Sequence, residues 1–293
     1  MKAVVTGGAG FIGLHLVKKL MDLGWEVTVI DNFSTGDQDK LHELGCQYIE
    51  EDVENVTAAM NIEHDVLFHL AAPVSVEESL NDPIKYYSQI VGGTSNIVNW
   101  SLNSGNKDII IASTAAIYGS IDDLPLIESG EIDPTSPYAK AKHMSELVLQ
   151  EEYEARPFKG SALRLFNVYG EGQRNEGGYL SAVPVFLKQY EAFAPITVTG
   201  DGKQTRDWIY VSDVVSACIS AYTDTVENGI QILNVASGQE TSVMDLAEAF
   251  GGEIVHIEER NEPKRSVADI TKIKTTLNWQ PFTRLLNWVK QVK

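Results

Sequence analysis

Short apolar runs alternate with longer amphipathic stretches through the first half of the chain. The runs read as buried strands, because strands of a parallel sheet are covered on both faces. The stretches between them repeat apolar residues at helical spacing. Strands are expected at residues 2–6, 25–30, 46–49, 66–70, 109–112 and 162–166, and helices at residues 14–23, 54–62, 77–104, 137–155 and 180–192. This alternation predicts an α/β fold built on a Rossmann-type, doubly wound parallel sheet.

The pattern changes after about residue 166, where loops rich in glycine and polar residues take over. Short strands are expected at 196–199 and 207–210, and the main sheet is expected to resume at 232–235. These features predict a nucleotide-binding domain at residues 1–165 that also receives about 208–236. Residues 166–293 are expected to form mainly a smaller C-terminal substrate-binding lobe, interleaved with the first domain.

A glycine-rich segment joins the first expected strand to the first helix. Gly7, Gly10 and Gly13 are spaced so that the backbone can turn sharply, approach a pyrophosphate and pack the helix on the sheet. The N-terminus of the helix adds N–H donors and a partial positive charge. Asp31 ends the next strand, near the distance expected of an acid that binds ribose. The segment therefore predicts a bound dinucleotide, and the charge of Asp31 favours NAD over NADP.

Two acids near this segment have a second interpretation. Asp31 and Asn32 together are also good turn chemistry, and both roles are compatible. Asp52 follows the third expected strand, where it either faces the adenine or caps a helix at the surface.

Tyr138 and Lys142 are four residues apart on an expected helix. This spacing places both side chains on one face, so the lysine ammonium can favour the tyrosine phenolate and make the tyrosine a base. The same spacing is common by chance on helix surfaces, so the pair gains weight only from the glycine-rich segment and the Ser113–Thr114 pair upstream.

Composition excludes several partners. The 293 residues carry a formal net charge of −18, which repels nucleic acid and anionic membranes. Cys46 and Cys218 fit neither a disulfide scaffold nor a zinc site and read as buried thiols, and no spacing of His, Asp or Glu suggests a metal. No apolar run is long enough to cross a bilayer, and the chain starts in a strand rather than a signal peptide. We expect a cytoplasmic protein without metal.

Longer segments resemble the extended short-chain dehydrogenase/reductase family, in its nucleotide-sugar branch of epimerases, dehydratases and decarboxylases. The resemblance covers essentially the whole chain. It rests on ordered matches at residues 6–13 (TGGAGFIG), 31–34 (DNFS), 52–53 (DV), 70–72 (LAA), 113–119 (STAAIYG), 138–142 (YAKAK), 164–170 (RLFNVYG), 200–211 (GDGKQTRDWIYV) and 234–238 (NVASG).

The resemblance implies roles for the matching residues. Tyr138 would be the catalytic base, Lys142 would hold the nicotinamide ribose and lower the tyrosine pKa, and Thr114 would bind the reacting sugar hydroxyl. Cofactor contacts are implied at Gly7, Gly10, Phe11, Ile12, Gly13, Asp31, Asn32, Ser34, Asp52, Val53, Leu70, Ala71, Ala72, Ser113, Tyr138, Lys142 and Phe166. Substrate contacts are implied at Thr114, Tyr138, Asn167, Arg206 and Arg260.

The diphosphate of the substrate would lie against Asn167, Arg206 and Arg260. Guanidinium suits this role because it binds phosphate with two hydrogen bonds. The alternative for Arg206 is a surface ion pair with Asp207.

Two alanines reduce the number of reactions that the resemblance allows. Family members share a first step in which the base takes the proton of the sugar C4 hydroxyl while C4 passes hydride to NAD. The dehydratases and decarboxylases resemble one another in carrying acids just after the catalytic threonine, where this chain has Ala115 and Ala116, which cannot move protons. The resemblance therefore implies a 4-epimerase of a UDP-hexose, similar to UDP-glucose and UDP-N-acetylglucosamine 4-epimerases, with NAD regenerated in each cycle.

Two alternatives stay open. One is another NAD-dependent nucleotide-sugar enzyme: a 4,6-dehydratase, a decarboxylase or a 4-reductase. The other is a non-catalytic NAD-sensing protein on the same fold. Ile90 also departs from the Asn usual in relatives, and the segment that follows Arg260 is about one residue shorter than theirs. The resemblance implies a homodimer formed by the helix at 77–104 and the helix that carries Tyr138.

Overall fold

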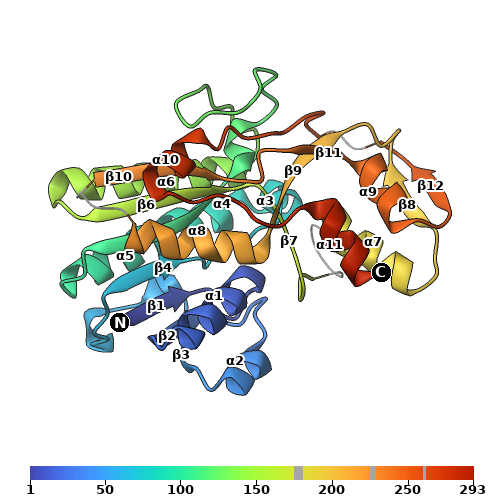
Figure 1. Ribbon diagram of the computed structural model, residues 1–293. Coiled ribbons are helices and arrows are strands. Elements are labelled where there is room, and N and C mark those ends of the chain that lie inside the picture. The colour runs from blue at the N-terminus through green and yellow to red at the C-terminus, as the bar shows by residue number, and fades with distance from the viewer. Residues whose placement is uncertain (175–180, 225–228, 260–261) are drawn as a thin grey trace.

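The computed structural model describes residues 1–174, 181–224, 229–259 and 262–293. Its centre is a seven-stranded sheet with the strand order β10-β6-β5-β4-β1-β2-β3, in which the pairings are parallel (Figure 1). The strands are β1 (Lys2–Thr6), β2 (Glu26–Asp31), β3 (Gln47–Glu50), β4 (Val66–His69), β5 (Asp108–Thr114), β6 (Lys159–Leu165) and β10 (Gly229–Val235). The predicted α/β class and parallel doubly wound sheet are confirmed.

Helices cover both faces of this sheet (Figure 1). One face packs against α1 (Phe11–Asp22), α8 (Val211–Thr223) and α10 (Thr271–Leu277), and the other against α5 (Gly93–Asn103) and α6 (Pro137–Ala155). Alternate residues of β1 enter the two cores: Val5 lies in the first and Val4 in the second. Burial on both faces explains why the strands have no polar alternation in the sequence.

The strand order changes direction beside β1. The chain runs from β1 to β2 and β3 on one side and returns with β4 on the other. At such a point the loops that leave neighbouring strands separate, and the crevice between them is the usual ligand site of open α/β sheets. The segments after β1 and β4 are therefore the first place to look for a cofactor site.

A smaller lobe lies beside the sheet, at the right of Figure 1. It contains a three-stranded sheet with the order β11-β9-β7 and a parallel pair β12-β8. Its elements are β7 (Asn167–Tyr169), α7 (Ala182–Glu191), β8 (Ile196–Thr199), β9 (Thr205–Tyr210), β11 (Glu240–Ser242), α9 (Val243–Phe250), β12 (Ile254–Ile257) and α11 (Leu285–Val292). Phe186, Trp208, Phe250 and Trp288 form its core. The strands expected at 196–199 and 207–210 are confirmed, as is the return to the main sheet at 232–235 through β10.

The prediction of a helix at residues 54–62 is wrong. This segment forms two short 3-10 turns, Val53–Asn55 and Ala58–Met60. The Asn96 amide on α5 donates to the carbonyls of Val53 and Val56 at 2.7 and 2.9 Å, so a side chain satisfies groups that a helix would have bonded internally.

The helix predicted at 77–104 is divided into shorter elements. These are α3 (Val76–Asn81), α4 (Pro83–Tyr87), a π turn (Ser88–Gly92) and α5. The break falls at Asp82, whose side chain caps the N-terminus of α4 by accepting from the backbone N–H of Lys85. Pro83 is the first residue of that helix. A further helix, α2 (Gln38–Leu44), and the helices α8 to α11 were not predicted.

Both cysteines are buried free thiols, as predicted. Burial raises the pKa of Cys46 to about 11 and that of Cys218 to about 12. Within the described residues, no helix combines the length and apolar character needed to cross a bilayer.

Candidate active site

The turn between β1 and α1 leaves no room for a side chain at Gly7 or at Gly13. Gly7 has a φ of +70°, and a Cβ there would lie 2.6 Å from the backbone nitrogen of Ala71. A Cβ on Gly13 would lie 2.1 Å from the carbonyl oxygen of Gly7. The loops after β1 and β4 therefore touch, which is possible only with glycine at these positions.

The N-terminus of α1 is open to an anion. Gly10 precedes the helix, no side chain caps it, and its first turn contains no acid. The first N–H groups of a helix need partners from outside it and favour negative charge. The segment that begins with Phe11 and Ile12 thus offers donors suited to a pyrophosphate.

Asp31 performs the turn role that the sequence allowed. Its carboxylate accepts hydrogen bonds from the backbone N–H groups of Ala9, at 2.9 Å, and Phe33, at 2.8 Å. Asp31 therefore fixes the glycine turn from the end of β2. Asn32, the next residue, donates to Asp52 at 2.5 Å and accepts from the N–H of Ser34 at 3.0 Å. These contacts bring the residues predicted after β2 and β3 together at one edge of the crevice.

The opposite edge of the crevice follows β4. There the Thr6 hydroxyl accepts from the N–H of Ala71 at 3.3 Å and is hydrogen-bonded to His69 at 2.7 Å. Ala72 packs in a small cluster that also contains Tyr138. Leu70, Ala71 and Ala72 therefore lie between the glycine turn and the candidate base. Phe166, in contrast, has a buried side chain that packs against Tyr118 in the main core.

Three predicted catalytic residues meet at the end of β5. α6 begins at Pro137, and the Ser136 hydroxyl caps it by accepting from Ala139, which places Tyr138 in the first turn. The Tyr138 hydroxyl is hydrogen-bonded to Thr114, the last residue of β5. Lys142 is buried one turn further along α6. A base, its hydroxyl partner and a cation are thus assembled from β5 and α6.

The expected effect of Lys142 on Tyr138 is not observed in this geometry. Burial raises the pKa of Tyr138, and the hydrogen bond from Thr114 opposes this rise. Lys142 instead donates to the carbonyl oxygen of Ala112 at 2.9 Å. Burial lowers the pKa of Lys142 to about 8, while the charge of Glu146 opposes this fall. Desolvation therefore outweighs the simple charge argument made from the spacing.

Glu146 was missed in the sequence. It is buried on α6, accepts a hydrogen bond from Ser113 and forms an ion pair with Arg164 of β6. The available signal was its position four residues after Lys142, on the same face of the helix.

A cavity of about 240 Å³ lies in the smaller lobe and contains two of the predicted substrate residues, Asn167 and Arg206. The Arg206 guanidinium forms a salt bridge of 2.8 Å with Glu262. The alternative pairing with Asp207 is wrong, because Asp207 is fully buried and accepts from Ser237 and Gly238 instead. Arg260 lies outside the described residues.

This cavity is connected to the catalytic end of the sheet through β6. Thr114 and Leu165 are register partners on β5 and β6, and Asn167 follows two residues later as the first residue of β7. Asn167 therefore extends from the same end of the sheet as Thr114.

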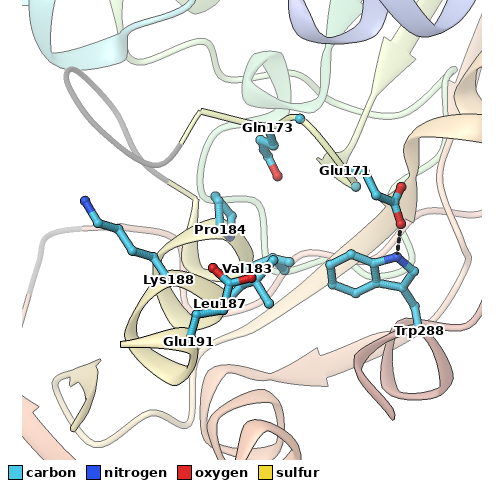
Figure 2. Close-up of a pocket in the computed structure, with 10 residues that line it drawn as sticks. Glu171, Gln173, Val183, Pro184, Leu187, Lys188, Glu191 and Trp288 are labelled. Carbon is cyan, nitrogen blue, oxygen red and sulfur yellow. Dashed lines mark hydrogen bonds between the residues drawn. The ribbon is translucent and has the colours of Figure 1, made fainter. Parts of the chain in front are cut away.

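A second hollow, between α7, the segment after β7 and α11, is too small for a nucleotide sugar (Figure 2). Its volume is about 60 Å³, which corresponds to about two waters. At its edge the Glu171 carboxylate accepts from the indole of Trp288 at 2.8 Å (Figure 2). It also accepts from the Tyr210 hydroxyl at 2.6 Å. The carbonyl oxygen of Glu171 accepts from His15 of α1 at 2.8 Å. These bonds join the smaller lobe to the helix that follows the glycine turn.

Comparisons with known proteins agree with this geometry. Residues 3–236 match the sequence family described as the NAD dependent epimerase/dehydratase family. The chain is 33% identical to a putative UDP-glucose 4-epimerase of Methanocaldococcus jannaschii, over 98% of both chains. It is 32% identical to UDP-glucuronic acid decarboxylase 1 of Xenopus tropicalis, over 97% of this chain and 69% of that one.

A solved structure shows the same fold. The UDP-glucose 4-epimerase of Thermotoga maritima, crystallised with UDP-glucose, superimposes with a TM-score of 0.93 at 31% identity. The match covers 100% of this chain and 97% of that one.

Proposed function

Because this chain belongs to the NAD-dependent epimerase/dehydratase family, we propose that it is a 4-epimerase of a UDP-hexose. The observation that carries the proposal is the end of β5. There Thr114 is hydrogen-bonded to the partly buried base Tyr138, and the residues that follow it are Ala115 and Ala116. The Thr114 oxygen also accepts from the N–H of Ala116 at 3.1 Å, so the turn is fixed with no acid in it. Such a site is suited to proton transfer at one carbon.

The residues of the crevice fit NAD. Gly7 and Gly13 have no room for side chains, and the N-terminus of α1 is uncapped. Asp31, at the end of β2, presents a carboxylate that would repel the 2′-phosphate of NADP. The cofactor residues proposed from the sequence keep their assignment, from the glycine turn to Asn32, Ser34, Asp52, Val53, Leu70, Ala71, Ala72, Ser113 and Phe166.

Bound NAD would supply the acceptor and then the donor of the C4 hydride. The protein supplies the proton chemistry. Tyr138 takes the proton of the C4 hydroxyl and returns it to the same oxygen when the keto group is reduced, and Thr114 orients that oxygen. Lys142 holds the nicotinamide ribose beside the base. The 4-keto sugar then turns within the site before reduction on its other face.

The smaller lobe would hold the nucleotide. Arg206 and Asn167 line the 240 Å³ cavity, and Arg206 provides a partly buried cation for the diphosphate. We propose residues 1–165 with 208–236 as the cofactor domain and residues 166–293 as mainly the substrate lobe. Arg260 would be a second diphosphate ligand.

A homodimer is proposed from the surface of α3, α4 and α6. Leu80 and Ile84 are 62% and 80% exposed, and Met144 and Leu147 of α6 are 42% and 44% exposed. Because α6 packs against both α3 and α4, these apolar side chains can form one self-complementary surface. Analytical ultracentrifugation tests this, and replacement of Ile84 and Leu147 by Glu should yield monomer.

The decarboxylase alternative is favoured by the relative from Xenopus tropicalis, which is nearly as similar as the putative epimerase. That reaction needs a further acid, since a proton must move at a carbon next to C4. The alanines after Thr114 argue against it.

Incubation of the purified protein with UDP-glucose, UDP-N-acetylglucosamine or UDP-glucuronate separates these reactions. We expect the C4 epimer at unchanged mass, followed by NMR of the anomeric proton, and its loss in Tyr138→Phe. A product of lower mass would identify a decarboxylase or dehydratase, and net consumption of NADH would identify a reductase. Tight binding of NAD without conversion of any of the three would contradict a UDP-hexose epimerase.

A further inference from the structure

A buried ion pair lies directly behind the candidate catalytic residues. Tyr138, Lys142 and Glu146 follow one another at four-residue intervals on α6, so they occupy one stripe of the helix. Glu146 is 1% exposed. Arg164 of β6 donates to both of its oxygens, from Nε to Oε1 at 3.0 Å and from Nη2 to Oε2 at 2.8 Å. This two-pronged contact fixes the plane of the carboxylate and compensates its burial.

The same carboxylate also accepts a hydrogen bond from Ser113. The Ser113 hydroxyl donates to Oε1 of Glu146 at 2.5 Å. A serine hydroxyl has one proton and two lone pairs. Because the single hydroxyl proton of Ser113 is donated to Glu146, Ser113 can only accept hydrogen bonds from any other partner. Ser113 immediately precedes Thr114 at the end of β5.

We propose that Glu146, held by Arg164, is a positioning residue that makes Ser113 an obligate hydrogen-bond acceptor toward the cofactor and places a counter-charge behind Lys142. The proposal rests on the proposed function, because it takes Ser113 to face the nicotinamide, whose carboxamide carries N–H donors. Glu146 itself would touch neither cofactor nor substrate, and it would act through its two neighbours.

Among the titratable groups that the structure describes around Lys142, Glu146 is the one that carries a negative charge. Tyr138 and His143 accompany it on α6, His69 faces it from β4, and Arg164 reaches Glu146 from β6. Burial and the charge of Lys142 lower the pKa of His69 to about 3, so this imidazole is neutral. Burial likewise lowers the pKa of Lys142, and Glu146 opposes that fall. Loss of the Glu146 charge should therefore let Lys142 deprotonate at lower pH.

Arg164 is held in turn by residues of two further elements. Its Nη1 donates to the Tyr118 hydroxyl at 2.9 Å, and that hydroxyl donates to the Asn234 side chain of β10 at 2.7 Å. Because Oε1 of Glu146 accepts from both Ser113 and Nε of Arg164, the amide of Glu146→Gln cannot satisfy all three donors in either orientation. In both orientations an N–H of Arg164 loses its acceptor, and the Ser113 hydroxyl no longer donates to a charged oxygen.

NADH titration by fluorescence tests the positioning role without depending on turnover. The proteins are the wild type, Glu146→Gln, Ser113→Ala and the double variant. Glu151→Gln is the matched control, because Glu151 is exposed on the same helix. We expect each single variant to weaken NADH binding by at least about fivefold. The double variant should bind as the weaker single variant does, because both changes remove one interaction.

Two results of the titration would overturn the proposal. One is Glu146→Gln binding NADH within about twofold of Glu151→Gln. The other is full additivity of the two changes in the double variant, which would mean that Glu146 does not act through Ser113. If Glu146→Gln does not fold, Ser113→Thr decides: retention of the wild-type affinity, with loss in Ser113→Ala, supports the acceptor role, and equal affinities of both refute it.

The pH profile on UDP-glucose supplies a readout that a purely structural role would not change. In Glu146→Gln we expect kcat to fall at least about tenfold, with KM nearly unchanged and the high-pH limb of kcat displaced toward lower pH. An unchanged limb would contradict the role assigned to the Glu146 charge. If the wild type converts no UDP-hexose, the epimerase proposal fails by itself, while the NADH titration still decides the role of Glu146.

Discussion

Lys142 donates its hydrogen bond to the carbonyl oxygen of Ala112, 2.9 Å away, and so joins α6 to the last residues of β5. The ammonium is held in a buried position where its pKa is about 8 rather than its ordinary 10.5. A cation kept in such a place costs stability, and this cost is present below pH 8, where the folded protein still carries the charge.

The variant Lys142→Met should therefore be more stable than the wild type but less active. We expect turnover to fall by about 100-fold or more, while unfolding at pH 7 becomes harder by roughly 1–2 kcal/mol. The stability gain should shrink as the pH rises from 8 toward 10.5, because the wild-type protein then sheds the buried charge. Thermal unfolding at several pH values measures this. Lys140→Met, at an exposed position of the same helix, should change neither property, and a fall in stability of Lys142→Met would refute the assignment.

Thr114→Val should shift the pH dependence of the reaction. The Thr114 hydrogen bond opposes the rise in the Tyr138 pKa that burial causes, so its loss raises that pKa further. Because the base must be deprotonated, the low-pH limb of the kcat profile should move to higher pH and kcat at pH 7 should fall. Thr114→Ser keeps the hydroxyl and should follow the wild type. Coincident profiles for the valine and serine variants would show that this hydroxyl does not act on the base.

Gly13→Ala should prevent cofactor binding. Its Cβ would lie 2.1 Å from the Gly7 carbonyl oxygen, a contact that requires the backbone of the turn to move. We expect NADH affinity to fall by about 100-fold or more, measured by fluorescence titration. Gly92→Ala is the control, since the nearest atom to its Cβ, a carboxylate oxygen of Glu54, is 3.8 Å away. Normal NADH binding by Gly13→Ala would contradict the proposed pyrophosphate site.

Asp207→Asn should destabilise the smaller lobe. The carboxylate accepts from the N–H and hydroxyl of Ser237 at 2.7 and 2.6 Å and from the N–H groups of Gly238 and Ala268 at 2.9 and 3.3 Å. An amide would turn an NH₂ toward some of these donors, at a cost of roughly 2–4 kcal/mol. Chemical denaturation measures the change. Asp201→Asn, at an exposed position, should cost much less, and equal losses in both variants would contradict the role of Asp207.

The sequence predicted the elements that are defined by local pattern. The strands of the main sheet are uninterrupted apolar runs, and α6 has a serine cap, a proline at its start and helical spacing, so their positions were readable. The segment at 54–62 failed because its backbone is bonded by Asn96, which is about 40 residues away in sequence and invisible to a local pattern. The same limit applied to Asp82, where a cap and a proline divide a stretch whose apolar spacing continues.

The candidate site was predictable in its residues but not in its electrostatics. Spacing indicated that Tyr138 and Lys142 share a face, yet it could not show that burial outweighs their mutual charge effect. Glu146 escaped notice because an acid in a helix is normally solvated, and only its partner Arg164, from a separate strand, makes its burial possible.

Glu171 links α11 to the first helix, α1. Trp288, five residues before the end, is bonded to the carboxylate of Glu171, and the carbonyl oxygen of the same residue is bonded to His15 in α1. Glu171 thus connects α1 and α11, two helices that lie far apart in the sequence. A variant without α11 would keep the residues of the glycine turn but would lose the Trp288 contact that fixes Glu171, and with it part of the support for His15.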